Sequence, residues 1–146
     1  MYIGTHLAAG LIIGKITGDY TPAIIGAVIA DVDHLYSYYK HGLFRSAKVF
    51  IKYARTKEDP IHDERNYLHN LNIVFGISLI IMLFNFFIGL VFLISYFSHL
   101  LFDALDQTDF YPFWPNMKIN LRGPIRFFSL GDIVISIVML VIFFIV

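Results

Sequence analysis

Eight ionisable side chains of this sequence fall inside or at the ends of apolar stretches. A charged group in an apolar segment is costly without a partner, so each one predicts a neighbour of complementary chemistry. His99 and Asp103 are four residues apart and share one face of a helix, as two ligands of one metal or as a ligand with its orienting carboxylate. The eight residues are His6, Asp31, Asp33, His34, His69, His99, Asp103 and Asp132.

Asp31-x-Asp33-His34 is the strongest of these signals. We expect it at the C-terminal end of a helix, where the macrodipole disfavours two carboxylates and a divalent cation would reverse the penalty. Because the sequence has no cysteine, the donors are imidazole and carboxylate, which suit zinc, manganese or iron. A cluster of two or three such ions lowers the pKa of bound water and clamps a phosphoryl group during displacement.

Some of these residues also have a structural interpretation. Asp132 follows Ser129 by three residues, which is the spacing of a helix capping box, so cap and ligand are equally open. His6 alone is more often a packing histidine. His99 and Asp103 alone could form a buried hydrogen-bonded pair. The metal interpretation therefore depends on these residues converging.

The composition predicts an integral membrane protein of one domain, residues 1–146. Hydrophobic residues make up 58% and charged residues 15%, and the mean hydropathy is +0.68. A soluble domain has roughly 25% charged residues. The formal net charge is zero, which argues against nucleic acid as a partner.

The apolar blocks predict an all-α, polytopic bundle of about five membrane segments, the first two of them short. An amphipathic helix lying on the membrane surface is expected near residues 43–52, where basic and apolar residues alternate. The expected segments are residues 3–16, 22–33, 67–84, 88–106 and 130–146, with loops at 35–66 and 107–128.

Alternation of these segments places the N-terminus and both loops on the same side of the membrane. That side holds ten of the eleven Lys and Arg residues, and only Lys15 falls at the other. The positive-inside rule then makes this face cytoplasmic and the C-terminus external. The same alternation brings the helix ends that carry the eight ionisable residues into one layer at the cytoplasmic boundary.

The order and spacing of these motifs resemble the YdjM-like membrane-bound, metal-dependent hydrolases, also described as LexA-regulated inner-membrane hydrolases. The resemblance covers nearly the whole chain. Two positions depart from the family pattern: Glu64 stands where a histidine is common, and Asn70 where a serine is frequent. Glu64 can still bind a metal. The matching motifs are Thr5-His6 with Gly10, Asp31-x-Asp33-His34, Arg65-x-x-x-His69, Ser98-His99-x-x-x-Asp103, Tyr111-Pro112-Phe113-Trp114-Pro115 and Asp132.

The family is in turn distantly similar to zinc-dependent phospholipases C, which implies phosphoester hydrolysis at a helical His/Asp zinc site. We expect a site at headgroup depth to act on a phospholipid or another amphiphile. Arg65, four residues before His69, suits the binding of the phosphate. Asp33 is the expected general base.

Two other functions remain open. Intramembrane His and Asp side chains also form relays in transporters of divalent metals or protons, although here they gather on one side. A structural metal could instead hold short helices together in a non-catalytic scaffold. Protein ligands would then fill its whole coordination sphere and leave no position for water.

Overall fold

The computed structural model describes residues 1–55 and 67–146 and confirms an all-α fold. No strand occurs in these two ranges. Glu64 and Arg65 lie outside them. The helices are α1 (Ile3–Thr17), α2 (Tyr20–Val28), α3 (Asp31–Lys40), the 3-10 helix η1 (Leu43–Arg45), α4 (Ala47–Arg55), α5 (Leu71–Phe84), α6 (Phe86–Ala104) and α7 (Leu130–Ile145).

One helix within the described ranges, α6, is long and apolar enough to cross a membrane. It has 19 residues, or about 28 Å at 1.5 Å per residue, against a hydrocarbon core of about 30 Å. Three shorter apolar helices accompany it: α1, α5 and α7. The predicted number of five membrane segments is therefore not confirmed by helix length.

The predicted segment 22–33 is wrong in its extent. The helix begins at Tyr20, because Asp19 caps it by accepting a hydrogen bond from the Thr21 N–H (3.3 Å). It ends at Val28, and a new helix, α3, begins at Asp31. Asp31 and Asp33 therefore occupy the first turn of α3, where the helix dipole favours carboxylates. The expected dipole penalty does not exist.

Helices α2 and α6 pack at very short range through small residues. A Cβ atom added to Gly26 would lie 2.7 Å from the carbonyl oxygen of Phe92 on α6. Ala23 and Ala27, on the same side of α2, are fully buried. Small residues allow two helix backbones to approach closely, as in membrane helix pairs. Here they bring the backbone of α2 within reach of the side chains of α6.

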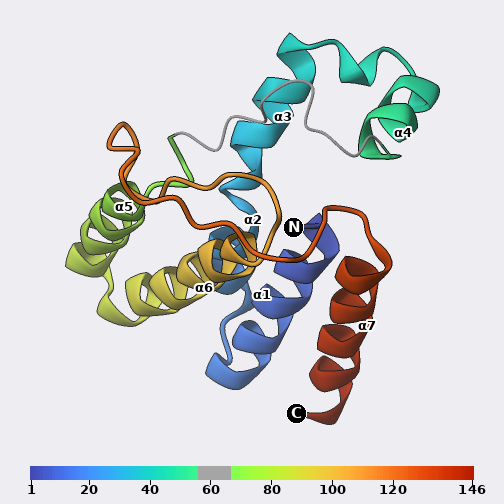
Figure 1. Cartoon of the computed structure of the whole chain (residues 1–146). Coiled ribbons are helices and arrows are strands. Elements are labelled where there is room, and N and C mark those ends of the chain that lie inside the picture. Colours follow the sequence, from blue (N-terminus) through green and yellow to red (C-terminus); the bar gives the residue numbers. More distant parts are fainter. Residues whose placement is uncertain (56–66) are drawn as a thin grey trace.

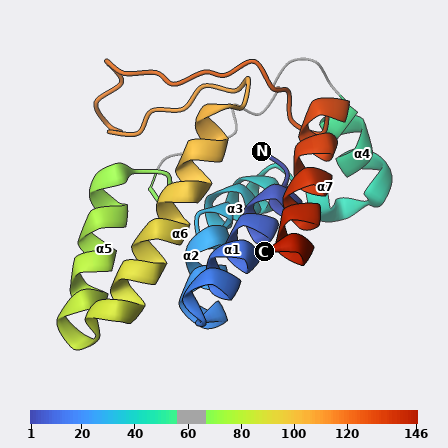
Figure 2. The same ribbon diagram turned by 90° about the horizontal axis from the view of Figure 1, so that it is seen from below.

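The helix ends that carry the ionisable residues gather at one end of the molecule. The N-terminus, the start of α3, the end of α6 and the long segment before α7 lie there, and the α1–α2 link, the α5–α6 turn and the C-terminus lie at the opposite end (Figures 1 and 2). Residues 107–128 form an extended excursion held by backbone hydrogen bonds such as Leu121 N–H to Phe110 O (2.8 Å). Phe110 is 1% exposed and packs against the ring of His69 (centroids 6.4 Å apart).

Candidate metal centre

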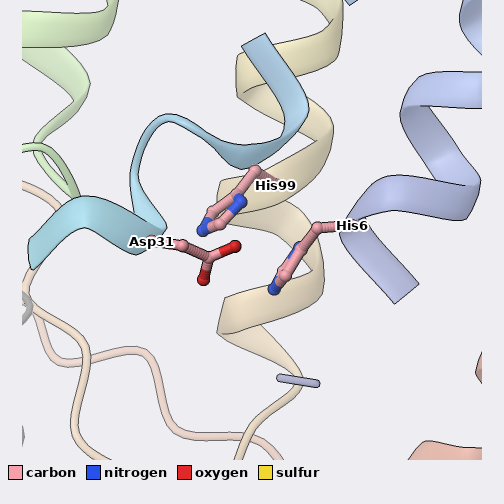
Figure 3. Close-up of side chains that lie close together, drawn as sticks. All are labelled: His6, Asp31 and His99. Atoms are coloured by element: carbon pink, nitrogen blue, oxygen red, sulfur yellow. The ribbon is translucent and has the colours of Figure 1, made fainter. Parts of the chain in front are cut away.

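Six of the predicted site residues converge into two adjacent groups of three. Within each group, one potential ligand atom per residue lies within 4.8 Å of the others, and all six residues are buried. Figure 3 shows how the first group converges from three different helices. The first group is His6, Asp31 and His99, and the second is His34, His69 and Asp103.

Asp103 belongs to the second group and also contacts the first. One carboxylate oxygen, Oδ2, is 3.0 Å from His69 Nε2 and 3.3 Å from His99 Nε2. The other, Oδ1, is 3.4 Å from His6 Nε2. The two ring nitrogens of His69 and His99 are 3.4 Å apart. Oδ2 thus faces a histidine of each group and Oδ1 faces a histidine of the first, so this one carboxylate could serve ions held by either group.

The contacts behind the rings fix which nitrogen faces the centre. His99 Nδ1 is 2.6 Å from the Ala27 carbonyl oxygen, and His69 Nδ1 is 3.2 Å from Asp33 Oδ2. An oxygen acceptor at Nδ1 requires that nitrogen to carry the proton, so Nε2 of a neutral ring presents its lone pair. Both lone pairs then point toward Asp103. Acceptor atoms that face one another repel, and a cation between them converts this repulsion into attraction.

The spacings among these atoms fit those of metal ligands. Two ligands about 2.0–2.1 Å from a zinc ion lie about 3.3 Å apart in a tetrahedron, and adjacent ligands of an octahedral ion lie about 3.0 Å apart. Among His69 Nε2, His99 Nε2 and Asp103 Oδ2, the distances of 3.3 and 3.4 Å match the tetrahedral spacing and the distance of 3.0 Å matches the octahedral one. These three atoms come from both groups, so the groups adjoin closely. Each group offers two imidazoles and one carboxylate, a set that leaves coordination positions for water or substrate.

The first group also contains buried polar atoms without a hydrogen bond. Among the described residues, Nδ1 of the fully buried His6 ring has no hydrogen-bond partner and nor does Asp31 Oδ2, whereas His6 Nε2 lies 3.4 Å from Asp103 Oδ1. The His6 and His99 rings stack with their centroids 3.7 Å apart. A buried polar atom without a partner is costly in a purely structural role. A metal ion held by this group could satisfy these atoms.

The whole sequence, residues 1–146, matches the YdjM inner membrane protein family. The chain belongs to this family. No curated protein and no solved structure matches it, so the predicted distant similarity to phospholipase C stays a prediction. Membership places this YdjM-family chain in a bilayer environment and accounts for its many exposed apolar side chains.

Asp33 lies behind the ring of His69, and its roles as a metal ligand and as the general base stay predictions. Its Oδ2 accepts hydrogen bonds from the Leu68 N–H (2.7 Å) and from His69 Nδ1. The described part of this YdjM-family chain places it in neither metal group. Its contacts favour an orienting role, because a carboxylate behind a ligating imidazole fixes the ring and raises its basicity.

Asp132 also lies in neither group of the described residues. It is fully buried, and its carboxylate accepts hydrogen bonds from the backbone N–H groups of Tyr2 (3.0 Å) and Phe128 (3.1 Å). Its own N–H donates to Ser129 Oγ (3.3 Å), the N-cap of α7. These contacts support the capping interpretation and tie the start of α1 to α7.

Asp106 is a buried acid beside the centre that the sequence analysis missed. The amino nitrogen of Met1 lies 2.5 Å from Asp103 Oδ1 and 3.3 Å from Asp106 Oδ2. Asp106 also accepts hydrogen bonds from the backbone N–H (2.9 Å) and the hydroxyl (2.8 Å) of Thr108. The sequence feature that could have identified Asp106 is its spacing of three residues from Asp103, which places the two acids close together at the end of a helix.

Proposed function

We propose that this chain is a membrane-bound, metal-dependent hydrolase that cleaves a phosphoester of a lipid or another amphiphile with a metal-activated water. The supporting observation is the pair of adjacent groups of two imidazoles and one carboxylate, with Asp103 in contact with both. Two-ion sites of about 3.5–4 Å separation are common in enzymes that cleave phosphoesters. Zinc, manganese and iron all suit these donors, and we propose two ions per chain.

Each part of the site has a distinct role in this proposal. When bound, divalent cations would supply a water of lowered pKa and neutralise negative charge on the phosphoryl group. Asp31, His6 and His99 would hold one ion, and His34 and His69 the other. Asp103 would contribute to both. Asp33 would hold the His69 ring in place, and the Ala27 carbonyl would do the same for His99. Phe110 would limit the access of bulk water. Arg65 remains our proposed phosphate-binding group.

We further propose that α1, α2, α5, α6 and α7 lie in the membrane, with the metal centre and the N-terminus on the cytoplasmic side. Exposed apolar side chains along α5 and α7, such as Leu79, Leu83, Ile137 and Val141, support this arrangement. The described Lys and Arg side chains at the end of the metal centre outnumber those at the other end, where Lys15 lies. Shorter helices can be accommodated by thinning of the bilayer.

Fusion of a reporter enzyme after Val146 tests this orientation. We expect a reporter that works only outside the cytoplasm to be active there, because α7 would carry the chain away from the positively charged face. The matched control is the same reporter inserted after Asn116, in the 107–128 excursion, where it should be inactive. A cytoplasmic C-terminal reporter would contradict the proposed arrangement.

Removal of metal from the detergent-purified protein tests the hydrolase. We expect hydrolysis of a chromogenic phosphoester or of phospholipid vesicles to fall more than about 100-fold after chelation, because the activated water is lost, and to return with zinc or manganese. Zinc flux in proteoliposomes without hydrolysis would support a transporter instead. Bound metal without either activity would support the structural scaffold.

A further inference from the structure

Helices α3 and α4, with η1 between them, form an arm with an unusual distribution of charge. Figure 1 shows this arm projecting beside the other helices. Residues 35–55 contain no Asp or Glu, although the chain as a whole has zero formal net charge. Their five basic residues are Lys40, Arg45, Lys48, Lys52 and Arg55.

Three of these basic residues follow one another closely along the arm. Lys48 and Lys52 are four residues apart on α4 and share a face. Arg45 ends η1, and the extended backbone of Ser46 separates it from α4. All three are exposed. Val49, which is also exposed, lies at the edge of this face, three residues before Lys52. We call Arg45, Lys48 and Lys52 the basic stripe.

The opposite face of α4 is held against α3 by aromatic rings. The ring of Tyr38 on α3 contacts Phe44, Phe50 and Tyr53 in edge-to-face geometry, with centroids 5.7–6.2 Å apart. Such contacts stabilise a defined packing arrangement. The basic stripe is therefore presented outward from a folded unit.

The arm also carries exposed aromatic side chains. Tyr36 and Tyr39 on α3 are 66% and 77% exposed, and Phe44, although it contacts Tyr38, is 55% exposed. Aromatic residues favour the headgroup region of a membrane, and basic amphipathic helices bind anionic lipid surfaces. A nucleic acid or an acidic protein would match the charge but would leave these aromatic and aliphatic side chains in water.

We infer that the basic stripe binds the headgroups of anionic phospholipids at the inner-leaflet surface. This inference rests on the membrane location of the family and is independent of the hydrolytic reaction. It also bears on the metal centre, because α3 begins with Asp31 and His34 and ends at Lys40. Ten residues of helix span about 15 Å. The basic stripe follows the Lys40 end of α3 in the chain, so a lipid that it holds would lie beyond the end of this helix.

The full chain in nanodiscs allows a direct test. The sequence has no cysteine, so Val49→Cys introduces a unique site for an environment-sensitive fluorophore. We expect a blue shift when phosphatidylglycerol is added to phosphatidylcholine discs, and loss of the shift in high salt. Inorganic phosphate at equal ionic strength should give no shift, which separates a lipid surface from a free anion.

Charge removal completes the test. Lys48→Gln together with Lys52→Gln should weaken the association with phosphatidylglycerol about 30-fold, given the usual contribution of each basic residue. Lys118→Gln with Arg122→Gln, which removes the same charge from the 107–128 excursion, should leave it unchanged. The metal content of each variant is measured as well. An unchanged metal content shows that the weaker association with lipid does not come from loss of metal binding. Equal shifts in zwitterionic and anionic discs, or equal loss in both double variants, would overturn the inference.

Discussion

Asp103→Asn should abolish phosphoester hydrolysis and reduce bound metal from about two ions per chain to one or none. The carboxylate faces His69 and His99 with one oxygen and His6 with the other. Asparagine has nearly the same shape but lacks the negative charge that both ions require. Elemental analysis of detergent-purified protein, together with hydrolysis assays, measures both effects.

Variants of single groups sharpen this prediction. Asp31→Asn alters the first group alone and should remove one ion, whereas Asp103→Asn affects both. We expect His99→Ala to abolish hydrolysis as well. The matched control is Asp33→Asn, since Asp33 contacts His69 from behind the ring. It should weaken metal binding about 10–100-fold but leave the number of ions at saturation unchanged.

Full hydrolysis with Asp103→Asn, or equal metal content in Asp103→Asn and the unmodified protein, would contradict a centre built on this carboxylate. One bound ion in the unmodified protein, lost equally with Asp31→Asn and Asp103→Asn, would indicate a mononuclear site. The proposed two-ion mechanism would then be wrong, although the ligand assignment would survive.

Asp132→Ala should lower the free energy of unfolding by about 3 kcal/mol without changing metal content at saturation. The substitution leaves the part-buried N–H groups of Tyr2 and Phe128 without their acceptor, and each such loss costs about 1–3 kcal/mol. Phe128 also has a positive φ of 57°, a conformation that this hydrogen bond stabilises. The midpoint of thermal unfolding in detergent should fall by about 10 °C.

Ser129→Ala provides the graded control for Asp132→Ala. It removes the side-chain cap from the Asp132 N–H and should cost about 1 kcal/mol. If Asp132→Ala instead lost one ion and kept its thermal stability, Asp132 would be a ligand and the contacts to Tyr2 and Phe128 would be secondary.

The convergence of the site was predictable from the sequence because it depends only on the alternation of helices. His6, His69, His99 and Asp103 each mark a helix end that alternation brings to one side, and the structure places them together. Asp106 was missed although it is the last residue of the segment expected at 88–106; the structure ends α6 at Ala104, just before it. Glu64 and Arg65 lie outside the described residues and stay predictions.

The break between α2 and α3 was not predictable from local sequence. Ile29 and Ala30 are neither Gly nor Pro, and their backbone angles stay in the right-handed helical region. The change of direction therefore arises from tertiary packing. The position of Asp33 has a simpler cause. Two residues along a helix rotate a side chain by about 200°, so Asp31 and Asp33 cannot both face the same ion.

The close approach of α2 to α6 at Gly26 determines which nitrogen of the His99 ring carries the proton. The Ala27 carbonyl reaches His99 Nδ1 only because no side chain separates the two backbones there. A larger residue at position 26 would push the helices apart and release the ring to choose the other tautomer. The donor chemistry of this histidine is thus set by a residue that has no functional group at all.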